Sequence, residues 1–163
     1  RKVGGSYSCM VAPFMLSKDH PLCGVNGVFN GIFVHGNVLG THKGITHYTI
    51  GQRKGLGLAM GHPVFVCEIR PETNEVVIGE NEDIFTTTIR ANHLNFMSVE
   101  DIDGEARALA KIRYNHRGDM CTLRKIDEDT IEAVFDKPQR AATPGQALVF
   151  YDGDYVMGGG TII

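Results

Sequence analysis

The second half of the chain shows the alternation of apolar and polar residues that is typical of β-strands. Over residues 106–114 one face is apolar and the other mostly polar, the apolar face carrying Ala106, Ala108, Ala110, Ile112 and Tyr114. This pattern predicts a strand that buries Tyr114 with the rest of that face. Further strands are expected over residues 90–96, 120–126, 130–135, 147–151 and 154–157, with a bend at 158–160 before a last strand. Short strands at this spacing predict a small antiparallel β-barrel.

The first half of the chain is less regular. Glycine and proline interrupt every apolar run before residue 28, which predicts an irregular leader over residues 1–27. Residues 32–40 have the pattern of a hairpin, and residues 64–70 and 75–79 that of two strands joined by a turn. Between them, Ile45, Tyr48 and Ile50 recur at helical spacing and predict a short helix over residues 44–52.

These elements predict a mainly β protein with a boundary near residues 83–87. A small α+β central domain with hairpins is expected over residues 28–85, and the β-barrel over residues 86–163. The chain of 163 residues is long enough for these two cores. It contains no apolar run of membrane-spanning length and opens on no signal segment, so we expect a cytoplasmic protein without membrane association.

Charge is unevenly distributed along the chain. The net charge is −3, which argues against general coating of nucleic acid, yet no acid occurs between Asp19 and Glu68. This acid-free region holds Arg53 and Lys54 next to several glycines, a pattern that favours an anionic partner. A solvated basic loop is the alternative interpretation. The glycine spacing does not match a dinucleotide-binding fingerprint.

A second basic group lies at the end of the strand predicted over residues 106–114. It contains Lys111, Arg113 and Arg117, with Tyr114 among them. Guanidinium groups can bind phosphate and an aromatic ring can stack on a base. The alternation favours packing of Tyr114 in the core over stacking.

The sequence predicts no metal site, because no Cys-x-x-Cys pair occurs and His42 and His47 are five residues apart. It contains neither a nucleophile elbow nor a phosphate-binding loop. Of the four cysteines, Cys67 and Cys121 fall in predicted strands, where burial is expected.

Several motifs in order resemble the C-terminal half of the bacterial tRNA-specific 2-thiouridylases. They span roughly residues 28–163 and comprise His42-Lys43-Gly44-Ile45, the run from Tyr48 to Gly57, Lys111-Ile112-Arg113-Tyr114, the run from Phe135 to Ala141, the run from Thr143 to Gly153, and Gly158-Gly159-Gly160.

The resemblance implies a function that composition alone does not. Members of the family adenylate the wobble uridine of certain tRNAs with ATP and replace the oxygen at position 2 with sulfur from a cysteine persulfide, supplied by a sulfur-relay protein. Their central domain is followed by a barrel that resembles the barrel of translation elongation factors. The family's N-terminal ATP-pyrophosphatase domain has no counterpart here. We therefore expect this chain to be inactive alone, with no cofactor of its own, and ATP with magnesium to act in the full-length enzyme.

The resemblance also assigns residues. The family's tRNA contacts carry over to Arg113, Tyr114 and Gln146, with Lys111, Arg117, Arg53 and Lys54 as weaker candidates. The assignment of Tyr114 conflicts with its expected burial, unless its hydroxyl or backbone makes the contact. Cys9 stands at about the distance of the family's second catalytic cysteine, but residues 6–10 lack the acidic surroundings of that cysteine.

A different class of function is a structural or protein-interaction barrel without RNA contact, which the net charge of −3 favours. The name tRNA methyltransferase is also attached to this family, but no feature of the sequence supports an S-adenosylmethionine pocket.

Overall fold

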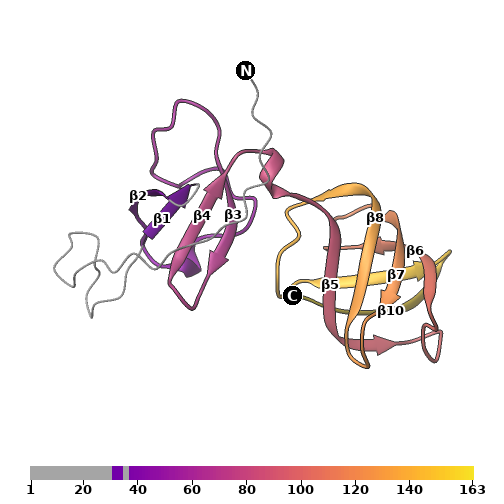
Figure 1. Ribbon diagram of the computed structural model, residues 1–163. Helices are drawn as coiled ribbons and strands as arrows, with labels where there is room; N and C mark the ends of the chain where they lie inside the picture. The colour runs from indigo at the N-terminus through magenta and orange to yellow at the C-terminus, as the bar shows by residue number, and fades with distance from the viewer. Residues whose placement is uncertain (1–30, 35–36) are drawn as a thin grey trace, which may run out of the picture. The chain divides into compact units, whose positions relative to one another are not determined.

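The computed structural model describes residues 31–34 and 37–163, which divide into two units between Glu80 and Asn81. Each unit contains its own β-sheet and its own core. The expected mainly β fold is confirmed, and the two units are described separately below (Figure 1). No helix in these residues is long and apolar enough to cross a membrane.

The first unit is a four-stranded mixed sheet in the order β2-β1-β4-β3. Its strands are β1 (Gly31–Val34), β2 (Asn37–Thr41), β3 (Phe65–Arg70) and β4 (Glu75–Gly79). The strands of both expected hairpins pair as predicted, and residues 35–36, which join the first pair, lie outside the described part. Parallel pairing of β1 with β4, in which Ile32 faces Val76, joins the two hairpins into one sheet.

The expected helix over residues 44–52 is wrong, because only one 3-10 turn, η1 (Ile45–His47), forms there. Gly44 has φ of 123° and Tyr48 is extended, so the helical conformation ends on both sides of this turn. Residues 49–64 form a loop instead. The loop is fixed to β3 where the Gly51 N–H donates to Val66 O at 2.7 Å and the Val66 N–H donates to Gln52 O at 3.0 Å.

The second unit is a closed antiparallel barrel in the order β10-β5-β8-β7-β6-β9. After a 3-10 turn, η2 (Glu82–Ile84), its strands are β5 (Phe85–Phe96), β6 (Glu105–Lys111), β7 (Asp119–Lys125), β8 (Ile131–Arg140), β9 (Ala147–Asp152) and β10 (Tyr155–Ile162). The expected barrel is therefore confirmed. The expected bend at residues 158–160 is wrong, because β10 continues through all three glycines.

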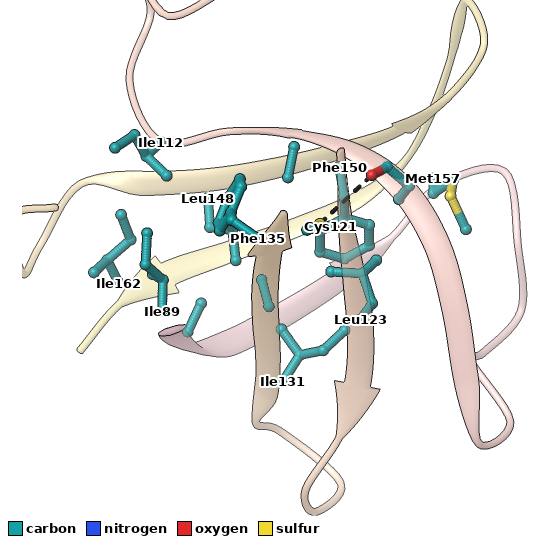
Figure 2. Close-up of a cluster of buried hydrophobic side chains, with 14 of the residues drawn as sticks. Ile89, Ile112, Cys121, Leu123, Ile131, Phe135, Leu148, Phe150, Met157 and Ile162 are labelled. Atoms are coloured by element: carbon teal, nitrogen blue, oxygen red, sulfur yellow. Dashed lines mark hydrogen bonds between the residues drawn. The ribbon is translucent and has the colours of Figure 1, made fainter. Parts of the chain in front are cut away.

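Inward-facing side chains from all six strands fill the barrel (Figure 2). Phe150, Leu123 and Cys121 are fully buried there, and the Cys121 Sγ donates to Ala108 O at 3.5 Å. Burial raises the pKa of the Cys121 thiol to about 11, so the thiol stays protonated. Expected burial is confirmed for Cys121, whereas Cys67 is only half-buried.

Candidate nucleic-acid interface

The barrel residues that the family resemblance assigns to tRNA contact lie on two connections that leave the barrel at the same end. Strand β6 stops at Lys111, which pairs with Val149 near the start of β9. The segment after Lys111 and the segment before β9 therefore emerge from neighbouring strands on one side. The first carries Arg113 and Tyr114, and the second carries Gln146. The fold thus brings together residues that are more than 30 positions apart in the sequence.

Tyr114 is 98% exposed, so the expectation that it packs in the core is wrong. Alternation holds as far as Ile112, which is buried at the edge of the core (Figure 2). The strand has ended by then, and the chain turns where the His116 N–H donates to Arg113 O at 3.0 Å. Tyr114 lies at the tip of this turn and presents its whole ring to solvent.

Gln146 is held by its backbone and exposes its side chain. Its N–H donates to Thr143 O at 3.2 Å, and its carbonyl accepts from the Ile162 N–H at 2.8 Å. The Gly145 N–H donates to Ile162 O at 2.8 Å, and Gly145 adopts φ of 86°, which favours glycine. A fixed loop with an exposed amide suits hydrogen bonding to an RNA backbone or base edge.

Apart from Arg140, the lysines and arginines of the barrel fall into two groups. The first group is neutralised by acids across the strands: Arg90 lies 2.9 Å from Glu132, Arg107 2.7 Å from Asp136 and Lys125 2.6 Å from Asp101, and Arg124 pairs with Glu105. The second group has no carboxylate within ion-pair distance in the described part of the chain and consists of Lys111, Arg113, Arg117 and Lys137.

This second group, which we call the unpaired cations, gathers around the turn that carries Tyr114. The Arg113 guanidinium donates to Arg140 O of β8 at 3.4 Å, which places the turn beside the end of that strand. Lys137 lies three residues earlier on β8 and is exposed. The Lys111 Nζ lies 5.2 Å from the centre of the Tyr151 ring of β9. Positive charge without internal compensation at one site favours a polyanion there.

The sequence alone does not identify Lys137 as a candidate, although it lies in the run from Phe135 to Ala141 that contributes to the family resemblance. Its membership of the group depends on β8 ending beside the turn of Arg113. The hydrogen bond from the Arg113 side chain to the Arg140 carbonyl joins distant segments, and local sequence patterns do not predict it.

Arg53 and Lys54 are exposed on the loop of the first unit. The side chain of Gln52 shapes this loop, because its Oε1 accepts from the Thr49 N–H at 3.0 Å and its Nε2 donates to Lys54 O at 2.9 Å. The loop borders a shallow hollow of about 640 Å³, lined by Arg53 and residues 55–64. The part of the acid-free region that carries Arg53 and Lys54, residues 49–64, therefore forms a structured loop rather than a helix.

His42 of the same unit is 4% exposed and contributes to this structure. Its Nε2 lies 2.8 Å from Asn74 O, and its Nδ1 accepts from the Gly44 N–H at 3.0 Å. No group of three His, Cys, Asp or Glu side chains within residues 31–34 and 37–163 could hold a metal ion. Cys9 lies outside the described residues.

Comparison with known proteins gives matches over both units. A family profile described as the tRNA methyl transferase PRC-barrel domain matches residues 25–80, and one described as the aminomethyltransferase β-barrel domain matches residues 86–162. A relative from Lachnoclostridium phytofermentans, named tRNA-specific 2-thiouridylase MnmA, is 61% identical over 134 residues, which make up 82% of this chain. The chain belongs to the tRNA-specific 2-thiouridylase family.

Other 2-thiouridylases of this name match in the same way. The protein of Carboxydothermus hydrogenoformans is 53% identical over 133 residues, and that of Clostridium perfringens is 47% identical over 160 residues. The alignments cover 82% and 97% of this chain. The chain spans about two fifths of the length of its 2-thiouridylase relatives, between 36% and 41% in these cases, and aligns with their C-terminal part.

Proposed function

We propose that this chain is the tRNA-binding C-terminal part of a tRNA-uridine 2-sulfurtransferase. Arg113, Tyr114 and Gln146 would contact the tRNA, and Lys111, Arg117 and Lys137 would add phosphate contacts around them. In the first unit, Arg53 and Lys54 would make weaker contacts. The observation that carries this proposal is the gathering of the unpaired cations around a fully exposed tyrosine at one end of the barrel.

The chemical steps belong, in this proposal, to a longer protein. ATP with magnesium would activate the wobble uridine in a separate catalytic domain, and a sulfur-relay protein would load the persulfide. Of the two cysteines in the described part of the chain, Cys121 is buried with a raised pKa and Cys67 is half-buried. We expect the 163-residue chain to bind tRNA without modifying it.

The direct test is the affinity of this chain for a tRNA transcript with uridine at the wobble position, with Arg113→Ala and Gln146→Ala as variants. Each substitution should raise Kd about five- to tenfold, since each removes a hydrogen bond to the RNA. The control is Arg90→Ala, which removes an arginine that is already paired with Glu132 at 2.9 Å. This control should leave Kd within about twofold.

Two results would contradict the proposal. Equal affinity of wild type, Arg113→Ala and Gln146→Ala would show that the assigned residues do not contact tRNA. No salt-sensitive binding by the wild-type chain would favour the alternative function, a structural or protein-interaction barrel without RNA contact.

A further inference from the structure

A polar side chain with almost no exposure lies directly beneath the turn that carries Tyr114. Gln139 on β8 is 2% exposed, in a position where an apolar residue would ordinarily be found. Its Nε2 donates to Asp119 Oδ2 at 3.1 Å and to Lys137 O at 2.8 Å. A buried amide is costly unless it is hydrogen-bonded. The bond to Lys137 O lies within β8, and the bond to Asp119 joins β8 to the start of β7.

The chain of contacts continues from Asp119 into the turn itself. Asp119 Oδ2 lies 3.6 Å from His116 Nε2, and His116 Nδ1 accepts from the Ile112 N–H at 3.4 Å. The His116 side chain is 15% exposed. It therefore connects the two ends of the turn, whose tip is Tyr114, to the carboxylate that Gln139 fixes.

The protonation state of His116 suits this connection. Burial lowers the pKa of His116, as do Arg113 and Lys111 on the β6 side, while Asp119 on β7 opposes them. From β8 the neutral Gln139 reaches the same carboxylate; Lys137 lies two residues before Gln139 and Arg140 directly after it. A neutral imidazole can accept at Nδ1 and keep its proton at Nε2, toward Asp119.

The backbone is also constrained where the segment after the turn leads into β7, at Gly118. Gly118 has φ of 91°, and a Cβ placed there would lie 2.5 Å from Leu109 Cδ2. The positive φ favours glycine, and a side chain there would also require the side chain of Leu109 to move. The turn is thus fixed at both ends while its tip is exposed, an arrangement that positions a contact residue before its partner arrives.

We propose that His116, Asp119 and Gln139 are positioning residues that hold the Arg113–Tyr114 turn ready for RNA. This inference rests on the proposed function. It assigns no RNA contact to the three residues themselves. Pre-ordering the turn removes part of the conformational entropy that binding would otherwise cost.

The direction in which Asp119→Ala changes tRNA affinity distinguishes a positioning role from a purely electrostatic effect. Removing a carboxylate beside the unpaired cations should by charge alone tighten binding of a polyanion. If Asp119 instead positions the turn, Asp119→Ala should weaken tRNA binding by about three- to tenfold, since the turn must then be ordered on binding. Asp119→Asn loses the charge but keeps an acceptor for Gln139, so it should bind tRNA at least as tightly as wild type.

The experiment measures tRNA affinity of the 163-residue chain for wild type, Asp119→Ala, Asp119→Asn, Gln139→Leu and Arg113→Ala. A matched control is Asp129→Ala in the β7–β8 turn at the other end of the barrel, where Asp129 likewise lies 3.4 Å from a histidine, His93. The control should leave affinity unchanged, and Gln139→Leu should weaken it like Asp119→Ala. Should Gln139→Leu not fold, the two Asp119 variants decide.

The affinities of the two Asp119 variants and of Arg113→Ala decide between the positioning role and its alternatives. Weaker binding by Asp119→Ala, with Asp119→Asn retained, supports positioning. Asp119→Ala binding as tightly as wild type or more tightly, while Arg113→Ala is weakened, overturns the positioning role and leaves the proposed function intact. Equal loss in Asp119→Ala and Asp119→Asn also overturns it, because the hydrogen bond would then be irrelevant. An unaffected Arg113→Ala overturns the proposed function itself.

Discussion

At the scale of single residues, the place where a strand ends decides what Tyr114 does. Its position in the alternating pattern predicts burial, and the pattern is followed as far as Ile112. The hydrogen bonds of β6 stop at Lys111. After Ile112 the alternation therefore no longer determines which side chains are buried. Sequence periodicity predicts the interior of a strand well and its end poorly, and here the site lies just past the end.

Because Tyr114 is exposed, we expect its substitution to change tRNA affinity but not the free energy of unfolding. Tyr114→Ala should leave the free energy of unfolding within about 0.5 kcal/mol of wild type, because no packing is lost. It should weaken tRNA binding by about 1–3 kcal/mol if the ring stacks on a base. Urea unfolding followed by circular dichroism and tRNA titration measure the two quantities.

Tyr114→Phe is the matched variant. It keeps the ring and should keep most of the affinity if stacking provides the contact. Loss of affinity in Tyr114→Phe as large as in Tyr114→Ala would assign the contact to the hydroxyl instead. Full affinity in Tyr114→Ala would remove Tyr114 from the interface.

At the scale of elements, short-range patterns were sufficient for most strands. The strands expected from alternation and turn residues all form, and Gly153, with φ of 57°, occupies the expected β9–β10 turn. The parallel pairing of β1 with β4 and the closure of the barrel between β6 and β9 join distant segments. No local pattern specifies such pairs. The candidate site depends on the second of these pairings, so only its residue types could be predicted.

The helix expected over residues 44–52 fails for a physical reason. Its apolar residues do recur at helical spacing, but Gly44 and Gly51 adopt positive φ, and the loop backbone finds its hydrogen bonds on β3. Tertiary pairing thus outweighs a weak local helical tendency in a glycine-rich segment.

The three glycines of β10 have a packing role rather than the expected bend. A Cβ at Gly158 would lie 2.6 Å from Asn95 O of β5, a backbone atom that cannot move away alone. Gly158→Ala should therefore destabilise the barrel by about 1–3 kcal/mol. Urea unfolding monitored by circular dichroism measures the change.

The control for this prediction is Gly153→Asn in the β9–β10 turn of the same hairpin. A Cβ at Gly153 has nothing within 4 Å, and asparagine tolerates its positive φ. Its effect should stay below about 1 kcal/mol. Equal stability of Gly158→Ala and wild type would contradict the prediction, because β5 and β10 would then make room for the added Cβ with little loss of free energy of unfolding.

At the scale of the whole molecule, net charge is a poor guide to the partner. The chain carries −3 overall, yet its charges are unevenly placed: four basic residues of the barrel pair with acids, as Arg107 does with Asp136, while Lys111, Arg113, Arg117 and Lys137 have no carboxylate within ion-pair distance among the described residues. Local uncompensated charge determines where a polyanion binds, because screening confines each exposed charge to a range of about 10 Å at ordinary salt. The chain can thus be acidic and still bind RNA at one end of its barrel.

The most direct test of this account is the salt dependence of tRNA binding. The slope of log K against log salt counts the phosphates that the protein neutralises. Compared with wild type, a variant with Lys111, Arg117 and Lys137 replaced by alanine should show a slope reduced by about one for each lost contact. A second variant with Arg90, Arg107 and Arg124 replaced by alanine loses the same formal charge from ion-paired positions and should retain the wild-type slope. Equal slopes in wild type and both variants, or a larger reduction in the second variant, would contradict the assignment of this end of the barrel to tRNA.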